Sequence, residues 1–262
     1  HTDHTPGFGS AAKYVASTVR EITLDANVYE KKSVTIIEIM GRHAGWLTAA
    51  SALARKYDGD NPLFIYLPET DFDQEAFLKD LEKAFETNCN LIVCVSEGIH
   101  DAEGTFICEY DSSVGTDTFG HKMLAGCGKY LENLVRSRLG VKARSVELNV
   151  SQRCSAAMIS ATDQQEAVAA GKFGVQAALN GETGKMVSFI REANADGNYQ
   201  MVCGLEDVNE ICNQEKVVPA EWITPDGHDV TEDFVRYARP LIQGDVNVPL
   251  GEDGLPAFVY RK

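Results

Sequence analysis

Arg42, Glu97 and Arg153 each come shortly after an apolar segment of the 262-residue chain. A guanidinium carries five donors in a fork that suits phosphate, and a carboxylate accepts hydrogen bonds from sugar hydroxyls. If these three side chains meet, they would suit a ligand that has both a phosphate and hydroxyl groups. The alternative is that Glu97 forms a structural salt bridge with either arginine, with no ligand involved. Arg144 is a further candidate, although it lies in the middle of an apolar segment.

The segment before Arg42 is typical of a buried parallel strand. Ser33–Met40 is rich in β-branched residues, with Thr35 and Glu38 as its polar side chains. Residues 44–57 then space their apolar side chains at helical intervals, so Arg42 falls where a strand ends and a helix begins. Ligands of open α/β sheets collect at the carboxyl ends of the strands. The pattern therefore predicts that Arg42 lies at a ligand-binding edge.

The rest of the chain alternates between strands and helices, which predicts an α/β fold with a parallel sheet flanked by helices. The alternation of strands and helices loosens over 101–121, and a pair of strands follows later in the chain. We predict parallel strands over 33–39, 62–69, 90–98 and 142–150, the strand pair over 184–192 and 199–208, and helices over 11–24, 44–57, 72–86 with Asp73 as its cap, 122–138, 163–181 and 232–238.

The composition excludes several classes of protein. The formal net charge is −15, from 39 acidic and 24 basic side chains, so nucleic acid and anionic membranes are poor partners. No stretch approaches the roughly 20 apolar residues of a membrane span, and the start lacks the pattern of a signal peptide. The seven cysteines include no CxxC pair, which favours reduced thiols in a cytoplasmic protein and argues against zinc.

Several motifs together resemble the phosphofructokinase family. They occur in the family's order and rough spacing, and the resemblance extends to about Gly181. The motifs are TDHTPGF at 2–8, EIMGRHAGWL at 38–47, PE at 68–69, SEG at 96–98 and QR at 152–153. The segments GRHAGWLTAA and NVSQRCSAAMIS are similar to sequences of the long bacterial branch that uses pyrophosphate.

The resemblance implies a binding site for fructose 6-phosphate. Met40, Gly41 and Arg42 would bind the substrate, Glu97 would contact the sugar, and Arg153 would hold the 6-phosphate. Arg144 would reach the sugar site of a neighbouring subunit, which implies a homo-oligomer of at least two chains. Two positions depart from the family. Val150 replaces a His or Tyr, and Ser33, next to Lys31 and Lys32, replaces an arginine that a partner supplies.

The resemblance also implies that the chain is a fragment. The family's glycine-rich GGD loop and its T-I-D-N-D segment, which carries the catalytic aspartate, should directly precede TDHTPGF. No catalytic base is therefore assigned within the chain, and the 262-residue polypeptide alone is expected to show no turnover. Residues 7–151 are predicted to form the sugar-phosphate domain, and 152–262 to return to an incomplete donor domain with a C-terminal extension.

The expected reaction is phosphoryl transfer to the 1-hydroxyl of fructose 6-phosphate, a step of glycolysis, with Mg²⁺ bridging the donor oxygens. Pyrophosphate is favoured over ATP as the donor, although the sequence leaves both open. One alternative is a sugar-phosphate-binding module without chemistry. A second is a periplasmic sugar-binding protein, which the cysteine content and the lack of a signal peptide disfavour.

Overall fold

The computed structural model describes residues 1–110 and 126–258, which belong to two compact units. Each unit is assembled from separate parts of the chain. Unit 1 contains His1–Tyr14, Arg153–Gln214 and Tyr237–Lys262, and unit 2 contains Val15–Gln152 and Glu215–Arg236. Glu215–Arg236 therefore groups with the residues of the predicted sugar-phosphate domain. The segment 101–121, where the predicted alternation of strands and helices loosens, lies partly outside the described residues.

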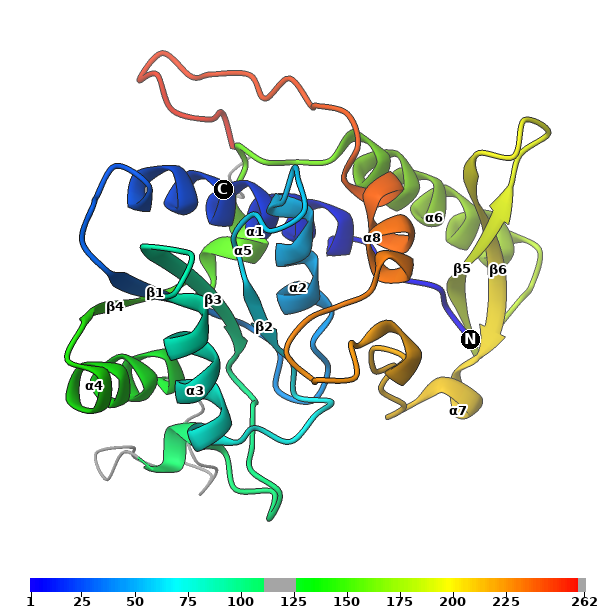
Figure 1. Cartoon of the computed structure of the whole chain (residues 1–262). Coiled ribbons are helices and arrows are strands. Elements are labelled where there is room, and N and C mark those ends of the chain that lie inside the picture. Colours follow the sequence, from blue (N-terminus) through cyan, green and yellow to red (C-terminus); the bar gives the residue numbers. More distant parts are fainter. Residues whose placement is uncertain (111–125, 259–262) are drawn as a thin grey trace. The chain divides into compact units, whose positions relative to one another are not determined.

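Unit 2 is built on a four-stranded parallel sheet, which confirms the predicted fold class (Figure 1). Its strands are β1 (Ser33–Ile39), β2 (Phe64–Tyr66), β3 (Asn90–Ser96) and β4 (Lys142–Glu147), in the spatial order β2-β3-β1-β4. The central strands β1 and β3 are buried on both faces, as their β-branched composition requires.

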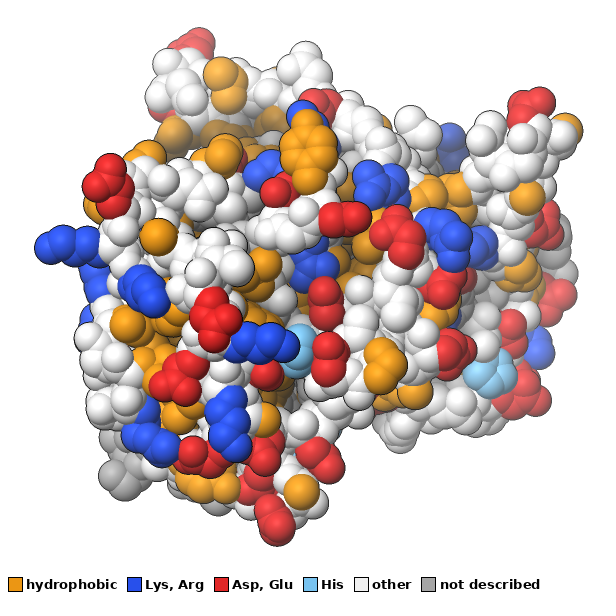
Figure 2. Space-filling model, viewed as in Figure 1, with side chains coloured by type: hydrophobic (Ala, Val, Ile, Leu, Met, Phe, Trp, Pro, Cys, Tyr) orange, Lys and Arg blue, Asp and Glu red, His pale blue; other side chains and the backbone are white. Residues whose placement is uncertain are grey.

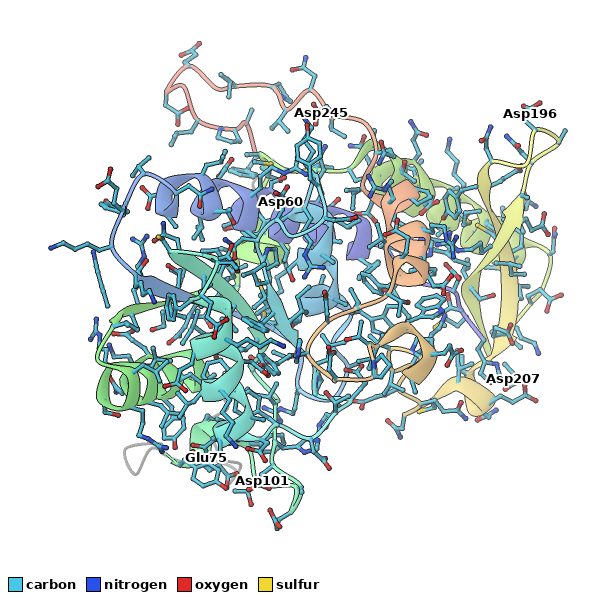
Figure 3. The ribbon with its side chains drawn as sticks, in the orientation of Figure 1. Asp60, Glu75, Asp101, Asp196, Asp207 and Asp245 are labelled. Atoms are coloured by element: carbon cyan, nitrogen blue, oxygen red, sulfur yellow. The ribbon has the colours of Figure 1, made fainter. Side chains whose placement is uncertain are left out.

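Helices cover both faces of this sheet. Helices α3 (Gln74–Ala84) and α4 (Cys127–Leu139) lie on one face, and α1 (Phe8–Ala26) and α2 (Trp46–Ala49) on the other (Figure 1). Asp73 caps α3, because its side chain accepts from the backbone N–H groups of Glu75 and Ala76. Arg138 of α4 forms a two-bond salt bridge with Glu75 of α3, at 2.8 Å for each bond; Glu75 is labelled in Figure 3.

Several predicted elements are shorter in the structure, including the strand predicted over 142–150, which ends at Glu147, and two of them differ most. The helix predicted over 44–57 is α2 followed by a 3-10 helix, Ala50–Ala54. It ends there because Arg55 is extended and donates to the carbonyl of Pro62 and to Asp229. The strand predicted over 62–69 keeps only Phe64–Tyr66, between Pro62 and Pro68, which have no N–H to give to the sheet. Residues 122–125 of the helix predicted over 122–138 lie outside the described part of the chain.

Unit 1 contains the predicted strand pair, β5 (Lys185–Ala193) and β6 (Tyr199–Asp207), which is antiparallel. The long helix of this unit is α6 (Ala161–Leu179). The remaining short elements of the chain are η2 (Ile107–Tyr110), α5 (Ser151–Cys154), α7 (Val208–Ile211), η3 (Ala220–Trp222), α8 (Glu232–Ala238) and η4 (Arg239–Ile242).

The surface agrees with the strongly negative charge. Acidic side chains are scattered over the face shown in Figure 2, with basic side chains among them. Among the described residues, no helix is both long enough and apolar enough to cross a membrane.

A buried histidine ties the start of the chain to the rest of unit 1. His4 lies between two carboxylates, with Nδ1 2.8 Å from Asp3 and Nε2 2.8 Å from Glu166. Ionised carboxylates can only accept, so the charged ring, which donates from both nitrogens, is the form that suits both neighbours. Burial lowers the pKa of His4, but the hydrogen bonds and charges of the two carboxylates outweigh it, so the pKa lies above 6.5.

This arrangement predicts a pH-dependent stability for unit 1. Because the folded state raises the pKa of His4, its stabilising contribution is complete below pH 6.5 and is lost as the pH rises through the folded-state pKa. The free energy of unfolding should therefore fall between pH 6 and pH 9. Urea unfolding at both pH values tests this, and His4→Gln should show a smaller difference. An equal difference in the variant would assign the pH dependence to another group.

Candidate functional site

The carboxyl ends of β1 and β3 lie side by side. Ile39 pairs with Ser96 in the parallel register, and the backbone N–H of Glu97 donates to the carbonyl of Ile39 at 2.9 Å. The turns that follow the two strands are therefore neighbours. Arg42 and Glu97, which the sequence placed after separate segments, are brought to one edge of the sheet.

Gly41 is the residue on which the two turns meet. Its N–H donates to Glu97 Oε1 at 3.2 Å, and its carbonyl accepts from Ser96 Oγ at 2.5 Å and from the N–H of Gly98 at 3.2 Å. A Cβ at position 41 would lie 2.7 Å from both the Ala44 carbonyl oxygen and Ser96 Oγ. The turn therefore requires glycine for close approach.

Arg42 is held in place by its backbone and not by its side chain. A Cβ at position 98 would lie 1.9 Å from the Arg42 carbonyl oxygen, so the Arg42 backbone rests directly on Gly98. The guanidinium is exposed and has no ion pair or hydrogen bond within the described part of unit 2. Glu97 likewise forms no ion pair there, which disfavours a structural salt bridge between Arg42 and Glu97. The cation and the carboxylate are both available to a ligand.

Arg144 lies away from this edge. It pairs in register with Thr35, four residues before Ile39, which places it about 13 Å back along the sheet. Its Nε donates to Thr35 Oγ1 at 3.1 Å, and its Nη2 lies 3.2 Å from Asp25. Together with Lys31, Ser33 and Lys142 it lines a cavity of about 330 Å³. The cavity therefore brings Arg144, which is predicted to serve a neighbouring subunit, together with Ser33 and its neighbour Lys31, and the role of Arg144 stays a prediction.

Arg153 and Val150 are both exposed. Arg153 lies in α5 and belongs to unit 1, whereas Arg42, Glu97 and Met40 belong to unit 2. The meeting of Arg153 with the other two charged residues therefore stays a prediction. Val150 is 55% exposed, so the position where the family has a His or Tyr faces solvent in this unit.

A buried glutamate of β1 that the sequence did not single out binds the start of α4. Glu38, 3% exposed, accepts from the N–H groups of Gly128 at 2.7 Å and Gly126 at 3.3 Å. It therefore caps α4, whose own N-cap residue is glycine. Burial raises the pKa of Glu38, and these donors oppose the rise. A single carboxylate within a strand of β-branched residues was the signal for this role.

Glu69 is a second residue that the sequence placed only within a motif. Its Oε1 accepts from the backbone N–H of Gly45 at 2.8 Å and of Val218 at 2.9 Å. The carboxylate therefore holds the start of α2, three residues after Arg42.

A larger cavity, of about 690 Å³, lies at the opposite end of the sheet, by the residues that precede β1 and β3. Its lining includes Asn27, Tyr57, Asn61, Asn88 and Asn90. This cavity does not include Arg42 or Glu97.

The turns at 41–42 and 97–98 place a guanidinium and a carboxylate at one edge of a parallel α/β sheet. The sequence matches the phosphofructokinase family over residues 1–178, and the chain belongs to that family. This result confirms the resemblance inferred from the motifs.

Three of the proteins similar to this chain are named for the use of pyrophosphate. The chain is 40% identical to a pyrophosphate–fructose 6-phosphate 1-phosphotransferase of Xanthomonas campestris, covering 100% of the chain and 62% of that protein, and 38% identical to the protein so named of Methylococcus capsulatus, covering 98% and 60%. The crystal structure of a pyrophosphate-dependent phosphofructokinase from Marinobacter aquaeolei matches with a TM-score of 0.84 at 33% identity, covering 100% and 63%. The chain thus spans about three fifths of the length of these relatives.

Proposed function

We propose that the full-length protein transfers a phosphoryl group from pyrophosphate to the 1-hydroxyl of fructose 6-phosphate. The observation that carries the proposal is the joined pair of turns, which presents the Arg42 guanidinium and the Glu97 carboxylate at one sheet edge. The names of the relatives support the choice of donor and acceptor.

The contacts of the turns suggest which residue binds which part of the substrate. The N–H of Gly41 already donates to Glu97 Oε1, so this backbone donor is not available to the phosphate. Arg42 binds the 6-phosphate, and Arg153 is the second arginine proposed for the same group. Met40 and Gly41 contact the substrate beside Arg42. Glu97 Oε2 is left to accept from a sugar hydroxyl. These residues orient the substrate, since phosphoryl transfer depends mainly on positioning and charge neutralisation. The catalytic aspartate is proposed to come from the T-I-D-N-D segment.

Mg²⁺ enters the proposal as the ion that accompanies pyrophosphate. It prefers oxygen ligands in octahedral geometry. Among the described residues, one group could hold a metal ion: His1, Glu206 and Glu210 of unit 1, with ligand atoms within 4.8 Å of one another. An imidazole ligand suits other metals better, so this group does not fit Mg²⁺. No described residue is therefore assigned to the ion.

The assembly and location follow from the same proposal. Arg144, with the cationic residues around its cavity, completes the sugar site of a neighbouring chain in a homo-oligomer. The protein acts in glycolysis in the cytoplasm, with neither nucleic acid nor membrane as a partner.

An aldolase-coupled assay of the full-length protein tests the reaction. We expect fructose 6-phosphate to be phosphorylated with pyrophosphate and Mg²⁺, and more slowly with ATP in place of pyrophosphate. Calorimetry without a donor measures binding of the sugar phosphate separately. Binding without turnover by either donor would contradict the reaction and support a non-catalytic binding module.

A further inference from the structure

Residues 215–236, here called the strap, lie beyond the part of the chain that matches the family, which ends at residue 178. The strap belongs to unit 2, and Figure 1 shows it as the orange segment that leads into α8. Its later half is attached to the sheet, because the N–H of Ile65 in β2 donates to the carbonyl of His228 at 2.8 Å. Arg55 adds a two-bond salt bridge to Asp229, at 2.9 Å for each bond.

The strap also contacts the segment that follows Arg42. Trp46 Nε1 donates to the carbonyl of Lys216 at 2.6 Å, and Lys216 Nζ lies 5.6 Å from the centroid of the Trp46 ring. Trp46 also packs against Trp222 and Phe234 of the strap, with centroids 6.1 Å apart in both pairs. Trp46 is thus in contact with the strap through its N–H and its ring.

One carboxylate oxygen joins the strap to the turn. Glu69 Oε1 accepts from both Val218 in the strap and Gly45 at the start of α2, at 2.9 and 2.8 Å. Glu69 Oε2 is buried without a hydrogen-bond partner, and a Cβ on Gly45 would lie 2.7 Å from it. Burial raises the pKa of Glu69, and the two backbone donors oppose this. The packing leaves the carboxylate little room to move without moving both segments.

The turn that carries Arg42 is therefore held at two ends. Ser96 and Glu97 hold Gly41, and Glu69 holds Gly45. The Arg42 guanidinium has no partner of its own within the described part of unit 2, so its position depends on the backbone between these two points. A displacement of about 1 Å at a positioning group can reduce a rate by as much as 100-fold.

We infer that the strap is a positioning element for the Arg42 turn, and that Glu69 is the positioning residue through which it acts. The inference rests on the proposed function for its substrate, fructose 6-phosphate. The strap acts on the turn and not through contact with the substrate. It limits the positions that the turn can take, so that the backbone carrying Arg42 is already in place when the phosphate binds.

The test is kinetic and uses the full-length enzyme. Glu69→Ala should raise KM for fructose 6-phosphate by about tenfold, with KM for pyrophosphate changed by less than about twofold. Trp46→Phe keeps a ring but removes the bond to Lys216, and should change the same KM in the same direction to a smaller extent. A purely structural role would lower Tm and the active fraction and leave both KM values unchanged.

Arg138→Ala is the matched control. It removes the salt bridge between α4 and Glu75 of α3 in the same unit, apart from the strap and the turn, and should lower Tm without raising KM for fructose 6-phosphate. An equal rise in KM in this variant would overturn the inference, because general loosening of unit 2 would then explain the effect. Unchanged KM values in folded Glu69→Ala and Trp46→Phe would overturn it as well.

Hydrogen exchange separates this inference from the proposed function. In Glu69→Ala the peptide that covers residues 40–47 should exchange faster than in the parent protein, whatever the substrate is. If the parent protein fails to phosphorylate fructose 6-phosphate but this exchange accelerates, the proposed reaction is wrong and the coupling of strap to turn stands. Unchanged exchange over 40–47 overturns the coupling even in an active enzyme.

Discussion

Arg42→Ala should weaken binding of fructose 6-phosphate by about 2–4 kcal/mol, or roughly 30- to 1,000-fold in Kd. The guanidinium has no partner within the described part of unit 2, so its removal leaves no other group uncompensated. The full effect should therefore appear in ligand binding and little of it in the free energy of unfolding. Calorimetry on the full-length protein measures the first quantity, and urea unfolding measures the second.

Two further substitutions serve as comparisons for Arg42→Ala. Arg42→Lys keeps the charge but loses the fork of donors, and should recover part of the affinity. Glu97→Gln should cost less than Arg42→Ala, because the amide oxygen can still accept one hydrogen bond. An unchanged Kd in Arg42→Ala would remove this residue from the site. A Glu97→Gln effect as large as that of Arg42→Ala would contradict the assignment of Glu97 to a hydroxyl.

Gly98→Ala should damage the site without altering any side chain that binds the ligand. The new Cβ would lie 1.9 Å from the carbonyl oxygen and 2.5 Å from the carbonyl carbon of Arg42, so one of the two turns must move. We expect a loss of about 3 kcal/mol or more in the free energy of unfolding, together with weaker binding of fructose 6-phosphate. Urea unfolding and calorimetry measure the two effects.

Gly171→Ala is the control for this substitution. Gly171 is exposed within α6, and a Cβ there would meet nothing within 4 Å. Alanine should therefore stabilise the protein by about 0.5–1 kcal/mol, through lower entropy of the unfolded chain. Gly98→Ala with parental stability and parental affinity would show that the Arg42 backbone can shift freely, and that the turn is not held as described.

The elements with a strong local pattern were predictable from the sequence. The strands Ser33–Ile39 and Asn90–Ser96 are buried on both faces, and their composition is typical of that environment. Asp73 was identified as a cap because the capping bond joins residues two and three positions apart. The strand predicted over 62–69 was too long because its apolar run continues past Tyr66 to Pro68, and the run does not show where the sheet stops pairing.

Some features of the site depend on neighbouring residues, and others depend on residues far apart in the chain. The sequence by itself determined that Arg42 and Glu97 each follow a buried strand, because strand ends and helix starts are written in neighbouring residues. Only the tertiary structure decided that β1 and β3 are adjacent and paired so that Glu97 holds Gly41, since the register depends on side chains far apart in the chain. The role of Glu69, and the return of residues 215–236 to unit 2, depended on the tertiary structure in the same way. They rest on the bond from the Val218 N–H to the Glu69 carboxylate and on the bond from the Ile65 N–H to the His228 carbonyl. Each bond joins residues roughly 150 or more positions apart, which no local pattern records.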